Sequence, residues 1–114
     1  MHDAAMQARL WYWQRLSAMV LALCVLVHLA IMIYAVRGGL SAGEILGRTR
    51  GNWAFGAFYG VFVLACAVHV PIGLTNIAQE WWGWHGAGVA TLAKIFGVLL
   101  LVLGLRAVYG VVVG

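Results

Sequence analysis

The chain has 114 residues, of which 65% are hydrophobic and only 9% are charged. A soluble domain of average composition carries about 25% charged residues, so this chain lacks the polar groups needed to cover a water-exposed surface. The net charge of +4 comes from basic residues spread along the chain, which excludes a nucleic-acid footprint. Cys24 and Cys66 lie inside apolar runs, which argues against a disulfide or a thiolate metal site. We therefore expect an all-α integral membrane protein with one domain over residues 1–114.

The first apolar segment covers about residues 16–36, and a membrane-spanning helix takes about 20 apolar residues. It follows Trp11, Tyr12 and Trp13, which are residues of the kind that sit at membrane interfaces. His28 lies inside the segment. An ionisable side chain is costly in hydrocarbon and therefore marks a functional site or a partner. We expect His28 to be either a metal ligand or a hydrogen-bond partner of another helix.

The second apolar segment covers about residues 53–77 and contains His69. It follows a polar, glycine-rich loop that has the potential for a short surface helix. Gly73, one turn after His69, leaves room for a flat macrocycle, and Pro71 can kink the helix and re-aim the histidine. Haem iron is commonly held by histidine between helices, where the apolar porphyrin fills the core. The alternative is a histidine hydrogen-bonded to a neighbouring helix beside an ordinary proline kink.

The third apolar segment covers about residues 89–113. The loop before it contains Trp81, Trp82 and Trp84, whose indoles suit the membrane interface. Two crossings separate these tryptophans from the aromatic residues before the first segment, so both groups should lie on the same side. Arg106 lies well inside the third segment. It either snorkels to the interface or pairs with a haem propionate, which suits the planar guanidinium.

Two stretches resemble the membrane-anchor subunits of succinate dehydrogenase and fumarate reductase. The first is QRLSA, at the start of the first segment. The second is HVPIGLTNIAQEWW, in which a histidine is followed four residues later by glycine and then by an acidic–aromatic pair. These residues are His69, Gly73, Glu80 and Trp81. The length, the three segments and the C-terminal VYGVVVG are similar to the smaller anchor subunit, so the resemblance covers essentially the whole chain.

The resemblance implies that the three helices are half of a six-helix haem-binding bundle, which a second anchor subunit completes. Such anchors bind haem b and hold the flavoprotein and iron–sulfur subunits on the cytoplasmic face of the bacterial inner membrane, with the N-terminus on that side. Electrons pass between the iron–sulfur chain and a membrane quinone.

The resemblance also implies roles for individual residues. The family's second-helix histidine is an axial haem ligand, which is His69 here, with Gly73 beside it. Two-haem members carry a histidine on the first helix, so His28 is expected to ligate a second, distal haem with Arg106 near its propionate.

The expected quinone contacts are less similar to the family pattern. Its quinone-contacting tyrosine near the end of the second helix is replaced here by Trp81. An indole can donate a hydrogen bond but cannot release a proton as a phenol can. Arg15 and Ser17 lie at the same membrane face, and Glu80 precedes Trp81, so these four residues are the expected quinone contacts.

Two other functions stay open. One is a cytochrome b anchor of another quinone-linked oxidoreductase, such as a formate dehydrogenase or a hydrogenase. The other is a haem-free membrane scaffold, in which His28 and His69 form hydrogen bonds between helices. Under each interpretation the chain is one subunit of a larger complex, because it has no nucleotide-binding loop and no set of iron–sulfur cysteines.

Overall fold

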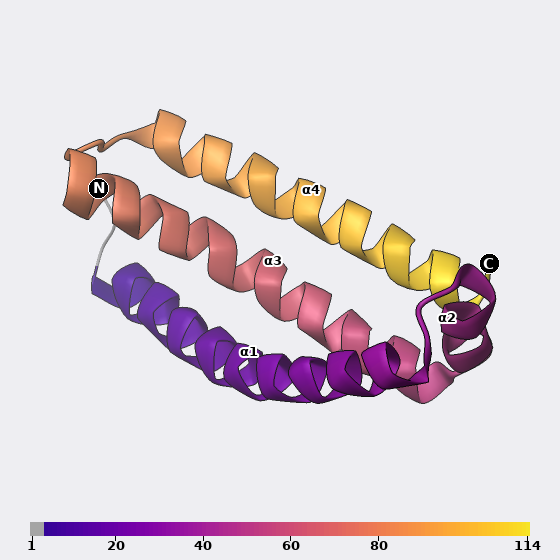
Figure 1. The fold of residues 1–114 in the computed structure, drawn as a ribbon. Helices are drawn as coiled ribbons and strands as arrows, with labels where there is room; N and C mark the ends of the chain where they lie inside the picture. Colours follow the sequence, from indigo (N-terminus) through magenta and orange to yellow (C-terminus); the bar gives the residue numbers. More distant parts are fainter. Residues whose placement is uncertain (1–3) are drawn as a thin grey trace.

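The computed structural model describes residues 4–114 as four helices joined by short loops (Figure 1). They are α1 (Ala4–Gly38), α2 (Ala42–Thr49), α3 (Trp53–Trp82) and α4 (Ala87–Val112). Helices α1, α3 and α4 are each long and apolar enough to cross a membrane, which is the organisation of a multi-pass membrane protein. The predicted all-α fold with three spanning helices is confirmed. Residues 1–3 of the expected domain lie outside the described part of the chain.

The helices run further than the apolar segments that predicted them. Helix α1 is described from Ala4, and it includes residues 4–15, which contain neither proline nor glycine and can therefore continue the helix. Its 35 residues span roughly 52 Å at about 1.5 Å per residue, more than the bilayer core of about 30 Å. Helix α3 continues to Trp82 and ends where Gly83 adopts a left-handed conformation with φ of 60°.

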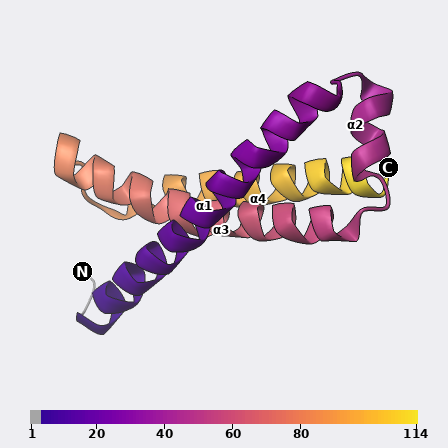
Figure 2. The same ribbon diagram turned by 60° about the horizontal axis from the view of Figure 1, so that its bottom comes forward.

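Helix α3 is central: α4 packs along it and α1 crosses it (Figures 1 and 2). Glycines let α3 and α4 approach closely. Gly104 faces the Val63 side chain, with only 2.7 Å between a Cβ placed on the glycine and the nearer Val63 methyl group. Near the end of α4, Gly56 of α3 faces Val112, where an added Cβ would make an ordinary contact of 3.4 Å. Packing of small residues therefore fixes the register of these two helices.

Pro71 belongs to the same contact. Proline has no backbone N–H, so the carbonyl of Ala67 loses its helical donor. Gly97 of α4 lies against both the Pro71 ring and this carbonyl, whose oxygen would be 3.2 Å from a Cβ on the glycine. Helix α3 is continuous through Pro71, and the Thr75 hydroxyl donates a hydrogen bond of 2.8 Å to the Pro71 carbonyl. The proline ring thus serves as a packing surface for α4.

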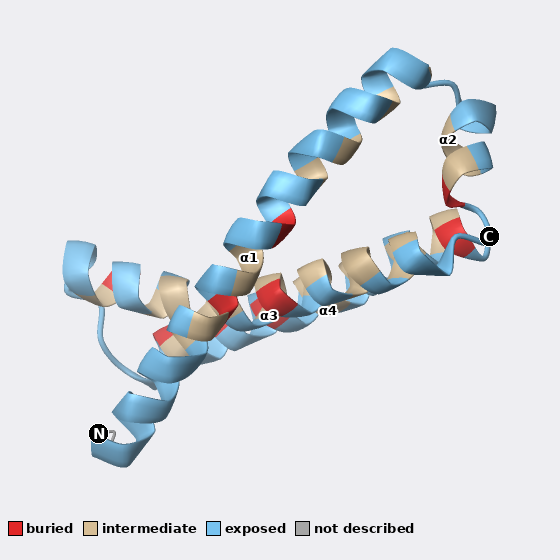
Figure 3. Ribbon diagram, turned by 90° about the horizontal axis from the view of Figure 1, so that it is seen from below, coloured by how far each residue is buried: buried red, intermediate tan, exposed pale blue. Residues whose placement is uncertain are grey.

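Helix α1 crosses α3 obliquely, and the two diverge toward both ends (Figure 2). The buried residues of α1 are Ser17 and Cys24, and most of the helix surface is exposed (Figure 3). Most of the large apolar side chains among the described residues are exposed. In a membrane-spanning chain this surface meets lipid or another subunit.

The two ends of the molecule differ in chemistry. The start of α1 and the α3–α4 loop lie at one end of the molecule, whereas α2 and the C-terminus share the other (Figure 1). The first end is called the tryptophan-rich end, because Trp11 and Trp13 belong to the first turns of α1 and Trp81, Trp82 and Trp84 lie at or beside the loop, as predicted. The short surface helix is α2. Its N-cap Ser41 accepts a hydrogen bond from the Glu44 backbone, and the Glu44 carboxylate accepts from Ser41 in return. These hydrogen bonds from Ser41 hold the pKa of Glu44 below its ordinary value.

Candidate functional site

Both intramembrane histidines lie where α1 faces α3, and each meets a hydroxyl group of the other helix. His69 of α3 is half-buried, and its Nδ1 atom lies 3.4 Å from the hydroxyl of Ser17, which is only 5% exposed. The same hydroxyl donates a hydrogen bond of 3.1 Å to the backbone carbonyl of Gln14, one turn earlier in α1. Ser17 thus joins the imidazole to the α1 backbone.

A second contact brings His28 of α1 to Tyr59 of α3. The His28 Nδ1 atom and the Tyr59 hydroxyl are 2.9 Å apart. The half-buried imidazole also meets the ring of Phe62 edge-on, with centroids 5.5 Å apart. Tyr59 in turn lies against the ring of Phe55, one turn earlier, at 4.4 Å. Apolar rings therefore surround a single polar contact, which strengthens its electrostatic component.

The two histidines lie at different depths. Tyr59 and His69 are ten residues apart on α3, which corresponds to about 15 Å along a helix. Helix α3 runs from the α2 end at Trp53 to Trp82, so His69 lies farther from α2 than Tyr59, the partner of His28. The two side chains are therefore separated along the length of the helix pair.

The second ring nitrogen of each histidine, Nε2, is left without a partner by the rest of the described chain. Within residues 4–114, the structure gives neither Nε2 atom a hydrogen bond. The Oε1 atom of Gln14 is the only fully buried side-chain polar atom that lacks a partner in this range. Neither Nε2 atom is therefore both fully buried and unpaired. No group of three or more metal-ligating side chains gathers in the described chain.

A polar notch lies between the N-terminal half of α1 and the C-terminal half of α3. Its volume is about 330 Å³, and polar and apolar side chains line it: Gln7, Leu10, Trp11, Gln14, Arg15, Ile72, Thr75, Asn76 and Gln79. The Arg15 guanidinium lies over the Trp11 ring, 5.0 Å from its centroid. The notch offers one cation and several amide groups, which suits a ligand that accepts hydrogen bonds.

Gly73 lies beside this notch, and Gln14 occupies the space it leaves. A Cβ added at Gly73 would be 3.3 Å from the Nε2 atom of Gln14. The glycine therefore allows α1 to approach α3 one turn beyond His69. Its expected role of making room for a porphyrin stays a prediction.

The other expected site residues lie farther out. Glu80 and Trp81 are exposed at the tryptophan-rich end, Trp81 to 75%, and neither lines the notch. Arg106 is exposed on α4, with its guanidinium over the Tyr109 ring at 5.7 Å. The register of α4 on α3 places Arg106 level with Phe62, the residue whose ring meets His28. Arg106 therefore shares the depth of His28.

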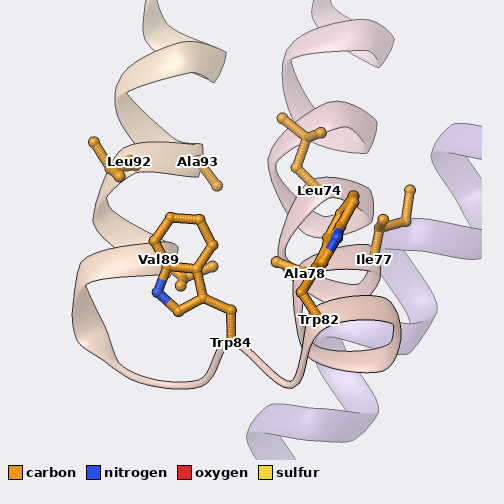
Figure 4. Close-up of a pocket in the computed structure, with 8 residues that line it drawn as sticks. All are labelled: Leu74, Ile77, Ala78, Trp82, Trp84, Val89, Leu92 and Ala93. Carbon is orange, nitrogen blue, oxygen red and sulfur yellow. The ribbon is translucent and has the colours of Figure 1, made fainter.

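An apolar hollow of about 690 Å³ lies where α3 and α4 diverge toward their loop (Figure 4). Trp82 and Trp84 face it from the loop side, and aliphatic side chains complete the lining: Leu74, Ile77, Ala78, Val89, Leu92 and Ala93. This lining supplies apolar contact and indole N–H groups but no charge and no metal ligand.

Sequence reasoning missed Tyr59 and Gln14. A tyrosine in a spanning helix needs a hydrogen-bond partner for its hydroxyl, and this requirement could have linked Tyr59 to one of the histidines. Gln14 stands in the QRLSA stretch beside Arg15, but its position over Gly73 depends on the crossing of α1 and α3. Protein-family models, curated protein sequences and solved structures were all compared with the chain, and none of them matches it.

Proposed function

We propose that this chain is the haem b-binding membrane anchor of a succinate:quinone oxidoreductase, that is, of a succinate dehydrogenase or fumarate reductase. The observation that carries the proposal is the pair of half-buried histidines, His28 and His69. In each of them Nδ1 lies within hydrogen-bond distance of a hydroxyl group, and Nε2 has no hydrogen-bond partner among the described residues. Metal-bound histidines use this arrangement, because a hydrogen-bond partner on one ring nitrogen orients the ring so that the other nitrogen can bind the metal.

In this proposal His69 ligates the haem nearer the iron–sulfur subunit and His28 ligates the distal haem. A second three-helix anchor subunit supplies the opposite ligands and completes a six-helix bundle. Bound haem supplies reversible one-electron chemistry. The chain's own residues hold the imidazoles, and Arg106, at the depth of His28, offers a cation to a distal propionate.

The polar notch is the proposed place of the quinone head group, where Arg15 would donate a hydrogen bond to a carbonyl oxygen. Ser17 lies deeper, at His69, and Glu80 and Trp81 lie at the surrounding surface. The iron–sulfur and flavoprotein subunits would dock at this tryptophan-rich end. The N-terminus would then be on the cytoplasmic side of a bacterial inner membrane, with lipid around the exposed helices.

The test is purification of the intact complex from native membranes through a tag on this chain. The proposal predicts that a flavoprotein and an iron–sulfur protein co-purify, that succinate reduces an added quinone, and that the preparation has a haem Soret band. A complex with haem but with a molybdenum or nickel–iron partner would instead identify a cytochrome b anchor of another quinone-linked oxidoreductase, and would contradict the proposal.

A haem-free scaffold is the second candidate, and the same contacts favour it. The hydrogen bonds with Ser17 and Tyr59 already give each histidine a partner on the neighbouring helix, and such a bond is worth about 1 kcal/mol in a membrane. Absence of a Soret band from the pure complex would support the scaffold and contradict haem binding.

A further inference from the structure

The hydroxyl of Ser17 determines which nitrogen of His69 carries the proton. A serine hydroxyl has one proton, and Ser17 donates it to the Gln14 carbonyl at 3.1 Å. Toward the His69 Nδ1 atom, 3.4 Å away, the same oxygen can then only accept. This arrangement makes two hydrogen bonds, whereas donation from Ser17 to Nδ1 would make one. Nδ1 of His69 is therefore protonated, and Nε2 carries the lone pair.

Tyr59 imposes the opposite arrangement on His28. Within residues 4–114, the Nδ1 atom of His28, at 2.9 Å, is the one hydrogen-bond partner that the structure gives the Tyr59 hydroxyl. If the imidazole donated, the phenol proton would have no acceptor and the Nε2 lone pair would have no donor. If the phenol donates, only the Nε2–H group stays unpaired. Because unpaired polar groups are costly in hydrocarbon, Tyr59 donates, and His28 is protonated on Nε2.

We propose that Ser17 and Tyr59 hold the two histidines in opposite tautomers, so that His69 has an unprotonated Nε2 atom whereas His28 has an Nε2–H group. A metal binds the unprotonated nitrogen of a neutral imidazole. Ser17 is thus a positioning residue that prepares His69 for iron. This last step rests on the proposed function, whereas the tautomers themselves do not.

His28 must rearrange before it can bind a metal. The proton on its Nε2 has to move to Nδ1, and the Tyr59 O–H bond has to rotate away so that the phenol oxygen accepts instead. The number of protons on the pair does not change. Metal binding at His28 therefore requires a rearrangement that metal binding at His69 does not.

Nitrogen-15 NMR of the full-length, histidine-labelled chain in lipid bilayers without haem tests the tautomers directly, at a pH where the imidazoles are neutral. Spectra of His28→Gln and His69→Gln assign the signals. The expected result is a protonated Nδ1 in His69 and a protonated Nε2 in His28. Ser17→Ala should turn the His69 signals into a mixture of tautomers, whereas Ser17→Thr, which keeps a hydroxyl group, should preserve them. The same tautomer in both histidines would overturn the inference.

A haem measurement separates this inference from the proposed function. In the complex purified from membranes, Ser17→Ala should weaken haem binding at His69 by about 10–100-fold, the usual effect of losing the hydrogen-bond partner of a metal-binding histidine. Tyr59→Phe should leave that site unchanged. Opposite tautomers in a complex that takes up no haem would confirm the tautomer assignment and contradict the proposed function. Haem uptake with identical tautomers would contradict the tautomer assignment and support the proposed function.

Discussion

Replacing Gly97 by alanine tests the packing that holds α4 against α3. The added Cβ would overlap the Pro71 ring and lie 3.2 Å from the Ala67 carbonyl oxygen. Ordinary contacts between carbon atoms are about 3.5–4.0 Å. A proline ring cannot rotate away, because it is closed onto the backbone, and the carbonyl is itself backbone. The two helices must therefore separate locally.

The magnitude follows from two opposing effects. Overpacking of this kind costs about 1–3 kcal/mol, whereas replacing glycine by alanine inside a helix gains up to about 1 kcal/mol. We expect a net loss of about 1–2 kcal/mol, which is a roughly 5- to 30-fold change in the ratio of folded to unfolded protein. Gly60 is the matched control, because a Cβ on this α3 glycine would meet nothing within 4 Å. Gly60→Ala should leave stability unchanged or raise it.

The assay is equilibrium unfolding in mixed micelles with increasing mole fraction of dodecyl sulfate, followed by far-ultraviolet circular dichroism. Gly97→Ala should unfold at a lower mole fraction than the wild-type chain, and Gly60→Ala should not. If Gly97→Ala were as stable as Gly60→Ala, the close contact of Gly97 with Pro71 would not be the one that sets the helix separation.

Three further outcomes are expected. Arg15→Leu should raise the KM for quinone about 10–100-fold, the cost of losing a hydrogen bond from a charged group, with haem content unchanged. Arg15→Lys should raise the KM by less. An unaltered KM in Arg15→Leu would show that Arg15 is not part of the quinone site. Arg106→Leu should lower the midpoint potential of the distal haem in a reductive titration, because a nearby cation favours the reduced form; an unchanged potential would contradict the propionate contact. Ser41 lowers the pKa of Glu44, so the Glu44 carboxyl group binds a proton less tightly in the folded state than in the unfolded state. The Glu44 carboxylate therefore stabilises α2 at pH values above its ordinary pKa. This contribution is lost as the pH falls through the lowered pKa. Carbon-13 shifts of α2 should report this loss on acidification, and Glu44→Gln, which does not titrate, should show no such transition.

The sequence predicted the features that depend on local composition. Apolar length predicted three spanning helices, the tryptophans predicted a shared end, and the cost of ionisable groups in hydrocarbon singled out His28 and His69. The helix ends were less visible, because residues 4–15 of α1 lie before the continuous apolar run that predicted the segment.

The partners of the histidines could not be predicted, since they depend on how two helices cross. Tyr59 is 31 residues from His28 and Ser17 is 52 residues from His69 in the sequence, and no periodicity links them. Gly73 shows the same difficulty. A glycine one turn from a histidine indicates space, but only the crossing of α1 over α3 shows that the Gln14 amide enters it.

The central claim is that His69 and His28 each hold a haem. The most direct measurement is a haem count on the purified complex by the pyridine haemochrome method, combined with a reductive titration of its visible spectrum. The account predicts two b haems for each copy of this chain, titrating at separate potentials, with one of them lost in His69→Gln and the other in His28→Gln. A complex with no haem, or with a haem content that neither substitution changes, would contradict it.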